Sequence, residues 1–141
     1  LFLEPDDLLY NRTNSAELVG KTGIFRGAAR QYSFASYLIR IRCASGMVSP
    51  TFLNFAMNAP MFRETEIVPH LKQQCGQANV NGTILRNMRI PVPPAAEQHR
   101  IVAKVDELMA LCDNLKADLA TAHQRQGTLA DTLIESALDA A

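Results

Sequence analysis

The sequence predicts an α+β protein in which a small mixed α/β domain is followed by one long coiled-coil helix. Two observations support this. Six of the seven glycines and all seven prolines precede residue 95, in a region of short alternating apolar and polar stretches that are typical of strands. Residues 95–138 contain no proline, are rich in helix-forming residues and place apolar side chains at a heptad spacing.

The boundary between the two parts is predicted at Pro91-Val92-Pro93-Pro94, because consecutive prolines continue neither a helix nor a sheet ladder. We therefore expect a small mixed α/β domain over residues 1–94 and a long coiled-coil helix over residues 95–141. The first part has ten basic and six acidic side chains, a net charge of +4, and the second has four basic and eight acidic, a net charge of −4. Such asymmetry is a hint that one part faces a polyanion.

The length of 141 residues allows one compact domain, or a small domain with one extended element. No apolar run is long enough for a membrane span, and no signal-peptide pattern opens the chain, so we expect a soluble protein with no membrane partner. Three widely spaced cysteines, Cys43, Cys75 and Cys112, argue against a disulfide framework or zinc ribbon. Because the chain starts at Leu1 in a strand-like stretch, we expect that the N-terminal part of the domain is missing.

Four segments of the first part have the composition of strands. They are residues 8–10, 22–26, 32–42 and 88–92. Within the third, alternation places Arg40 and Arg42 on one face and Ile39 and Ile41 on the other. A helix of three turns is expected from Pro50 to Phe62, with Ser49 as its N-cap.

The long helix carries a seam of positions spaced alternately by four and three residues. The predicted interface residues are Ile101, Val105, Leu108, Cys112, Leu115, Leu119, Leu129 and Leu133, with Ala122 and Gln126 as weaker seam positions between them. At 1.5 Å per residue a helix of this length extends about 66 Å, so its seam requires a partner helix. A helical hairpin that folds back at Gly127 is the alternative.

Several enzyme motifs are excluded. Gly20-Lys21-Thr22 lacks the earlier glycine and the following helix of a phosphate-binding loop. No GxGxxG, no adenine-methylating loop and no metal-dependent nuclease motif is present, and the three histidines are isolated from one another and from cysteine. The sequence therefore predicts no catalytic residues, no metal site and no cofactor.

Three polar segments remain, rich in Arg, Asn and Gln. They are residues 11–15, 26–31 and 73–82, and we expect each to be a loop. Arginine pairs with guanine and phosphate, and amides pair with adenine, so these segments are candidates for DNA contact. The alternative is that the amides and glycines form turns and the arginines are solvated.

In this order, the segments resemble the target-recognition unit of a type I restriction-modification specificity subunit. The matching pieces are Asp7 to Ser15, Glu17 to Gly23, Phe34 to Arg40, Gln77 to Gly82 and the run Ile90-Pro91-Val92-Pro93-Pro94-Ala95-Ala96-Glu97-Gln98 that enters the long helix. The last piece is the most specific of them. Together they cover nearly the whole chain.

The resemblance implies a non-catalytic DNA reader with two recognition domains, held apart by two long antiparallel helices that dock methyltransferase subunits, and joined by an endonuclease subunit. On this basis Arg12, Lys21, Arg26 and Arg30 are expected to contact phosphates or guanine. The amides of Asn14, Gln77, Asn79 and Asn81 are expected to approach bases. The recurrent amide pieces are alternatively part of the scaffold.

The resemblance also implies a prokaryotic, cytoplasmic protein whose partner is double-stranded DNA. Because only one long helix is present, we expect self-association through residues 101–136. The competing hypothesis is a coiled-coil assembly module with no DNA binding of its own.

Overall fold

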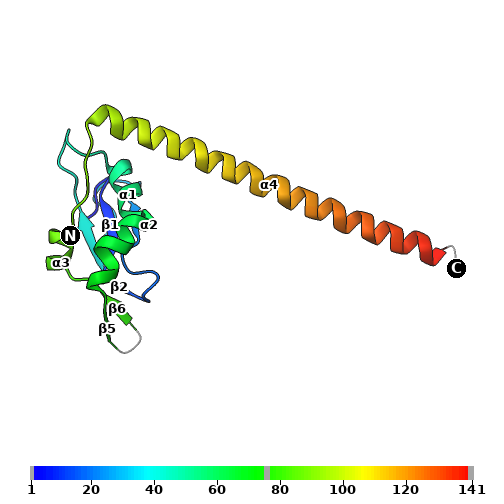
Figure 1. Cartoon of the computed structure of the whole chain (residues 1–141), viewed down its shortest axis with the longest axis horizontal. Coiled ribbons are helices and arrows are strands. Elements are labelled where there is room, and N and C mark those ends of the chain that lie inside the picture. The colour runs from blue at the N-terminus through cyan, green and yellow to red at the C-terminus, as the bar shows by residue number, and fades with distance from the viewer. Residues whose placement is uncertain (1, 75–76, 140–141) are drawn as a thin grey trace. The chain divides into compact units, whose positions relative to one another are not determined.

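The computed structural model describes residues 2–74 and 77–139, without the side chains of residues 72–74, 77, 133, 137 and 139. The chain divides into two compact units, Leu1–Val102 and Ala103–Ala141. Figure 1 shows strands and short helices in the first unit and a single helix in the second. The elements are β1 (Leu8–Asn11), β2 (Thr13–Asn14), β3 (Thr22–Ile24), β4 (Leu38–Ile41), α1 (Pro50–Asn58), α2 (Pro60–Phe62), a π-helix (Arg63–Ile67), a 3-10 turn (Val68–His70), β5 (Lys72–Gln74), β6 (Gln77–Asn79), α3 (Gly82–Asn87) and α4 (Ala95–Asp139). The predicted α+β class with a long C-terminal helix is confirmed.

Two small antiparallel sheets form the framework of the first unit. One has the order β3-β1-β4 and the other the order β2-β6-β5. In the first sheet Leu8 pairs with Ile41 and Tyr10 with Ile39, so one face of β1 and β4 is apolar. The predicted alternation along β4 is confirmed, because Ile39 and Ile41 pack on the core whereas Arg40 and Arg42 bind Asp7.

Arg12 joins the two sheets through its backbone. Its N–H donates to the Tyr37 carbonyl at 3.0 Å, beside β4, and its carbonyl accepts from the Val80 N–H at 2.9 Å, just after β6. Residue 12 is therefore the step between β1 and β2, and a single stretch of chain contributes one strand to each sheet.

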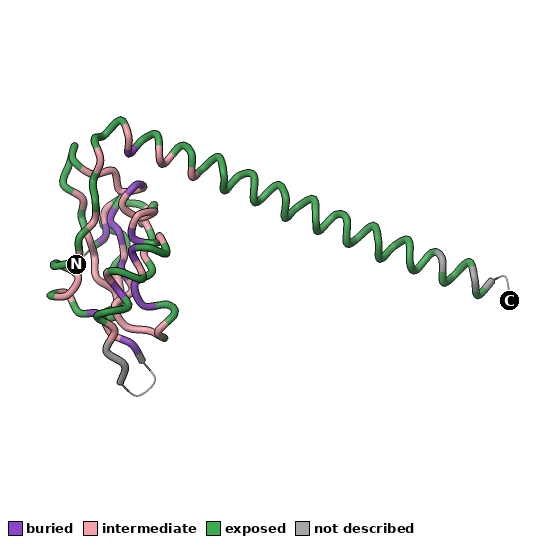
Figure 2. Tube along the Cα trace, viewed as in Figure 1, coloured by how far each residue is buried: buried purple, intermediate pink, exposed green. Residues whose placement is uncertain are grey.

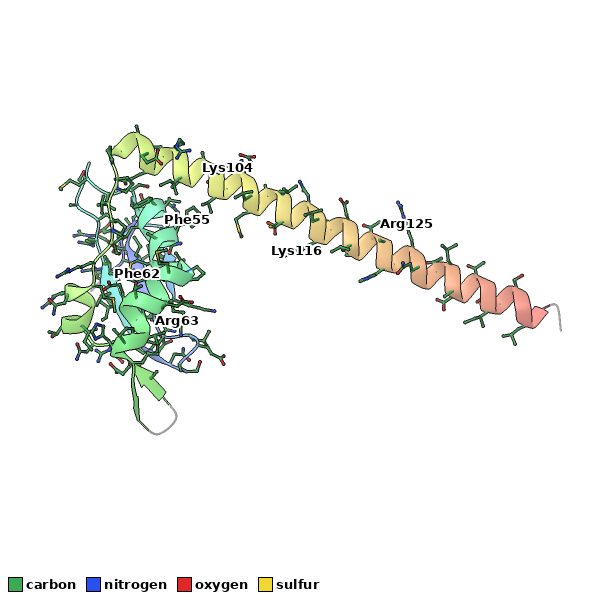
Figure 3. All side chains as sticks on the ribbon, in the orientation of Figure 1. Phe55, Phe62, Arg63, Lys104, Lys116 and Arg125 are labelled. Carbon is green, nitrogen blue, oxygen red and sulfur yellow. The ribbon has the colours of Figure 1, made fainter. Side chains whose placement is uncertain are left out.

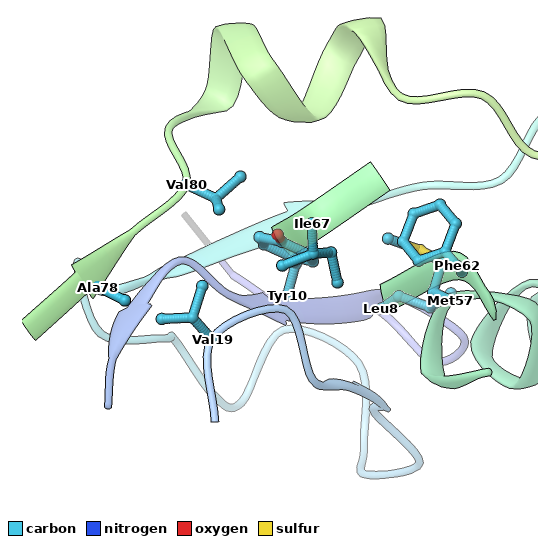
Figure 4. Packing of buried hydrophobic residues seen from close by; sticks show 8 residues of the cluster. All are labelled: Leu8, Tyr10, Val19, Met57, Phe62, Ile67, Ala78 and Val80. Atoms are coloured by element: carbon cyan, nitrogen blue, oxygen red, sulfur yellow. The ribbon is translucent and has the colours of Figure 1, made fainter. Parts of the chain in front are cut away.

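The core lies between the sheets and the helical segment that follows α1. Its buried residues are Leu8, Tyr10, Val19, Met57, Phe62, Ile67, Ala78 and Val80, shown in Figure 4. Gly20 has a φ of +92°, and a Cβ there would lie 2.3 Å from Ile67 Cδ1, so both the backbone conformation and the packing require glycine. The strand expected directly after Lys21 is confirmed over Thr22–Ile24.

The helix predicted after Ser49 begins as expected and ends earlier. The Ser49 hydroxyl accepts from the Phe52 N–H, and Pro50 occupies the first helical position. The helix stops at Asn58 because Ala59 is extended (ψ 140°) before Pro60, as residues before proline usually are. A second short helix, α2, places Phe62 in the core and continues into the π-helix, which places Ile67 there.

Several sequence-based boundaries were wrong. Residues 88–92 form no strand: the Arg89 N–H donates to the Glu66 carboxylate, and Pro91 has no N–H for a ladder. The strand expected over residues 32–42 is limited to β4. The expected loop at 73–82 instead includes most of β5, all of β6 and the first residue of α3. The expected loop at 11–15 includes the last residue of β1 and all of β2. Position 75 lies outside the described residues.

The second unit contains the larger part of α4. This helix begins at Ala95, which belongs to the first unit, and continues through Gly127 without a break. The hairpin alternative is therefore wrong. Figure 2 shows this helix exposed from residue 106 onward, apart from residues not described. An exposed helix of this length buries none of its apolar side chains by itself.

Candidate nucleic-acid interface

Carboxylates at the start of the chain bind four of the arginines. Glu4 pairs with Arg30 and Asp6 with Arg26, and both pairs are exposed to solvent. Asp7 is buried and binds the guanidinium groups of two arginines at once, Arg40 and Arg42. The residues from Glu4 to Asp7 therefore neutralise most of the charge of these four arginines.

Asp7 is the centre of this cluster. Its carboxylate accepts from Arg42 Nε at 2.8 Å and from the Glu4 N–H at 2.9 Å. Burial alone would raise the pKa of Asp7, but the hydrogen bonds from Arg42 and Glu4, with the charges of Arg42 and Arg40, hold that pKa below its ordinary value. Asp7 is thus ionised and acts as a structural anchor between the start of β1 and the end of β4.

Arg63 is the only arginine of the π-helix, and it holds the turn between β2 and β3. Its Nη1 donates to the Val19 carbonyl at 2.8 Å, and its Nη2 donates to the Ala16 carbonyl. Figure 3 labels it beside Phe62. Nearby, burial raises the pKa of the Tyr10 phenol to about 12, against a smaller opposing effect of the Arg63 charge. Both groups are parts of the core framework.

Three of the predicted base-reading amides make internal hydrogen bonds. Asn79 Nδ2 donates to Thr13 Oγ1 at 2.9 Å, across the β2-β6 ladder. Asn81 Oδ1 accepts from the Ile84 N–H at 2.9 Å and caps α3. Asn14 Oδ1 accepts from the Ser15 N–H at 2.8 Å in a turn. These contacts favour the scaffold interpretation for the amide pieces, because an amide committed to the fold has fewer groups left for a base.

The other predicted contact residues differ in their surroundings. Lys21 is exposed, and no ion pair joins its side chain to the part of the chain described here. Arg12 is half-buried, and its Nε is enclosed with no hydrogen-bond partner in the described ranges. The side chain of Gln77 lies outside the described residues. Lys21 therefore keeps its ammonium donors for a ligand, whereas the enclosed Nε of Arg12 does not reach the surface.

Sequence reasoning missed the role of Gln98, which is 2% exposed. Its Oε1 accepts from the Ser49 N–H at 2.8 Å, and its Nε2 donates to the Met47 and Pro93 carbonyls at 3.0 and 2.9 Å. All of these groups belong to the first unit. The available signal was a glutamine three residues inside a helix that starts directly after two prolines.

The predicted seam of α4 is apolar and exposed. Leu108, Leu115, Leu119 and Leu129 each expose about half or more of their surface, and Cys112 is also exposed. Ile101 and Val105, near the start of the helix, are partly buried. Leu133 belongs to the helix, but its side chain lies outside the described residues. Figure 3 shows charged side chains such as Lys104, Lys116 and Arg125 along the same helix.

Residues 2–74 and 77–139 contain no group of three or more His, Cys, Asp or Glu side chains placed to hold a metal ion. Within the same ranges, no helix combines the length and the apolar character that crossing a bilayer requires.

Comparison with known proteins decides the family. Residues 14–122 match the type I restriction modification DNA specificity domain. The chain belongs to this family. The match covers more than half of the chain and extends from the last residue of β2 into α4, so it includes β3 to β6 and the first part of the long helix.

This specificity domain resembles curated proteins over much of its length. It is 29% identical over 136 residues to the type I restriction enzyme StySPI specificity subunit of Salmonella potsdam, covering 96% of this chain and 29% of that protein. It is 25% identical over 133 residues to the EcoEI specificity subunit of Escherichia coli, covering 94% and 22%. The EcoAI specificity subunit of Escherichia coli is 38% identical over 64 residues, covering 45% and 11%. The specificity domain thus spans less than a third of the length of these relatives.

Proposed function

We propose that this specificity domain recognises double-stranded DNA as part of a type I restriction-modification specificity subunit. In this role it has no catalytic activity and directs methyltransferase and endonuclease subunits to a bipartite target. The observation that carries the proposal is the family match over residues 14–122, which includes β3 to β6, the candidate segments 26–31 and 73–82 and the first part of α4. The names of the relatives, all specificity subunits of type I restriction enzymes, support it.

We also propose a boundary after Pro94 between the part that contacts DNA and the part that contacts protein. The helix begins at Ala95, and residues 1–94 carry the net charge of +4. The predicted contact residues Arg12, Asn14, Lys21, Arg26, Arg30, Gln77, Asn79 and Asn81 all lie in the first part. Electrostatic attraction between this part and the phosphates supplies sequence-independent affinity, and base contacts supply the discrimination.

The second part is proposed to associate with another helix through residues 101–136. The heptad seam and the exposure of its leucines support this proposal. A row of apolar side chains that is exposed in the single chain is expected to be buried against a partner helix. In the isolated chain the partner is a second copy, with the helices antiparallel. In the whole subunit the partner is a helix of the same polypeptide.

One observation favours the second candidate function, a coiled-coil assembly module without DNA binding of its own. Arg26, Arg30, Arg40 and Arg42 pair with carboxylates, and Arg63 binds two carbonyls. Arginines that are occupied in this way have fewer N–H groups left for DNA, although the net charge of the domain is unchanged. The two functions make opposite predictions about duplex binding.

The deciding experiment measures binding of the chain to a fluorescent duplex by anisotropy. The salt concentration is varied from about 50 to about 300 mM, because phosphate contacts lose affinity over roughly this range. DNA recognition predicts affinity that falls steeply with salt. Lys21→Glu should weaken binding, whereas the matched charge reversal Lys104→Glu on α4 should leave it close to that of the wild type. Absence of binding at the lowest salt, while a complete specificity subunit binds the same duplex, would support the assembly module instead.

A further inference from the structure

The loop of residues 25–32, between β3 and β4, is hydrogen-bonded to the start of the chain. Four backbone hydrogen bonds of 2.8–2.9 Å join residues 25–32 to residues 3–7: Asp6 N–H to Phe25 O, Phe25 N–H to Asp7 O, Arg30 N–H to Leu3 O and Leu3 N–H to Tyr32 O. The backbone of this loop is therefore fixed by the fold before any ligand binds.

Local packing gives the loop a defined shape. The rings of Phe25 and Tyr32 meet edge to face, with their centroids 5.7 Å apart. A Cβ at Gly27 would lie 2.5 Å from the Phe25 ring, so the loop can close over this ring only with glycine. Arg30 has a φ of +60°, an uncommon value for a residue other than glycine, asparagine or aspartate. The fold thus presents the Arg30 side chain from an unusual backbone position.

The two arginines of this loop are used differently. Both terminal nitrogens of Arg26 are occupied, since Nη1 binds the Asp6 carboxylate and Nη2 donates to Thr51 Oγ1 at 3.1 Å, in the first turn of α1. Arg26 therefore links the loop to a helix. Each terminal nitrogen of Arg26 thus has only one N–H group left for a second ligand.

Arg30 is bound through its Nε atom, and its two terminal nitrogens are free of partners among the described residues. Its Nε donates to Glu4 Oε1 at 3.1 Å, and its side chain is 80% exposed. Neither Nη1 nor Nη2 makes a hydrogen bond to any residue that the structure describes. This geometry leaves the planar pair of terminal N–H groups directed to solvent, while the carboxylate of Glu4 limits the rotation of the guanidinium.

We propose that Arg30 is the arginine of this loop that contacts DNA, with Glu4 as its positioning residue, and that Arg26 serves to hold the loop. This inference depends on the proposed DNA recognition and assigns it to one guanidinium. The ligand is a pair of acceptor atoms within reach of two parallel N–H groups, which a duplex offers as phosphate oxygens or as guanine O6 and N7.

The test compares Arg30→Gln with Arg26→Gln, two substitutions that remove the same charge from the same loop. Anisotropy titrations with one duplex over a salt series give the slope of log affinity against log salt. If Arg30 binds a phosphate, Arg30→Gln should reduce this slope by about 0.9, the contribution of one phosphate contact. Arg26→Gln should lower the urea midpoint of the domain and leave the slope unchanged. An equal fall in slope for both variants, or no loss of affinity with Arg30→Gln, would overturn the proposal.

Selection from a randomised duplex pool distinguishes the two sources of the ligand. A phosphate contact predicts that Arg30→Gln weakens binding to all sequences to the same extent. A guanine contact predicts that the selected consensus loses its preference for guanine at one position, with a cost there of about ten-fold or more. Either result supports the proposal. An unchanged consensus with unchanged affinity contradicts it.

The positioning role of Glu4 is tested by comparing Glu4→Gln with Glu4→Ala. Both variants lose the same negative charge, but only glutamine keeps an acceptor for Arg30 Nε. Glu4→Gln should bind DNA about two- to ten-fold more tightly than Glu4→Ala, the range that one hydrogen bond contributes. Equal affinities would show that Glu4 does not position Arg30.

Failure of this inference is distinguishable from failure of the proposed function. If the wild-type chain binds no duplex at low salt, the proposed DNA recognition by this chain fails. If the wild type binds with a steep salt dependence and Arg30→Gln binds equally well, DNA recognition stands and only the assignment to Arg30 fails.

Discussion

The side-chain carbonyl of Gln98 accepts a hydrogen bond at 2.8 Å from the backbone N–H of Ser49, the residue that caps α1. The start of α4 is thereby joined to the start of α1, although the two residues are 49 positions apart in the sequence. The same amide also donates to the carbonyls of Met47 and Pro93. A single buried side chain satisfies three backbone groups that have no ladder or helix partner.

Replacement of Gln98 by leucine should destabilise the first unit by about 2–4 kcal/mol, because it leaves a buried N–H and two carbonyls without partners. The measurement is urea unfolding followed by tyrosine fluorescence, which reports on this unit because all three tyrosines lie in it. His99→Leu is the matched control, since His99 is the exposed neighbour on the same helix. Equal stability of the two variants would contradict the role assigned to Gln98.

Asp7→Asn should lower the free energy of unfolding at pH 7 by about 1–3 kcal/mol, because Arg40 and Arg42 lose their buried partner while remaining partly solvated. The pKa of Asp7 is lowered in the folded state, so its stabilising contribution is present above the unfolded pKa of about 4. It is lost as the pH falls through the folded value.

The urea midpoints of wild type and Asp7→Asn should therefore approach each other as the pH falls below the unfolded value of about 4. Glu97→Gln is the control. The pKa of Glu97 is also lowered, chiefly by its hydrogen bond with Arg100, but this pair is exposed on the helix surface. Its removal should change the stability of the first unit little. A constant difference between the urea midpoints of wild type and Asp7→Asn at every pH would show that the carboxylate charge does not stabilise the folded state.

Tyr10→Phe should be neutral or stabilising by up to about 1 kcal/mol at pH 7. The Tyr10 hydroxyl is buried and has no hydrogen-bond partner among the described residues, so its removal sacrifices no contact found there.

Burial raises the pKa of this phenol from 10 to about 12, so the unfolded chain releases the proton first as the pH rises. Wild-type stability should thus decline above pH 10, and Tyr10→Phe should remove this part of the decline in urea unfolding at pH 7 and about pH 10.5. A loss of 2 kcal/mol or more at pH 7, in round terms the cost of an orphaned buried group, would indicate a partner for the hydroxyl.

Leu115→Glu should reduce self-association of the chain at least about ten-fold, because it places a charge in the seam that the partner helix covers. Sedimentation equilibrium measures the dissociation constant. Ala117→Glu adds the same charge two residues further along, away from the seam, and should leave association nearly unchanged. A chain that sediments as a monomer at high concentration before any substitution would refute the proposed association.

Much of the local structure was predictable from short sequence patterns. The Ser49-Pro50 pair predicted the start of α1 because capping and proline preferences act within one turn. The alternation in β4 and the heptads in α4 predicted which side chains face the same way. The loop at residues 26–31 was also anticipated, since no strand or helix of the structure includes it.

The functional assignments of individual side chains were not predictable in the same way. Asn79 and Asn81 have the composition expected of base-reading amides, but their hydrogen bonds to Thr13 and to the α3 backbone depend on partners that the fold brings near. Arg26 and Arg30 look equivalent in the sequence, and only the positions of Asp6, Thr51 and Glu4 distinguish them. Residues 88–92 have a strand-like composition, yet no neighbouring strand pairs with them.

The sequence by itself determined the α+β class, the long helix after Pro94 and its apolar seam, because helix propensity, proline placement and periodicity are local properties of the chain. The tertiary structure alone decided which charges remain available. The net charge of +4 over residues 1–94 counts every arginine alike, whereas folding places the carboxylates of Glu4, Asp6 and Asp7 against four of them. Ion pairing depends on distances between residues up to 35 positions apart, which only the packed chain defines.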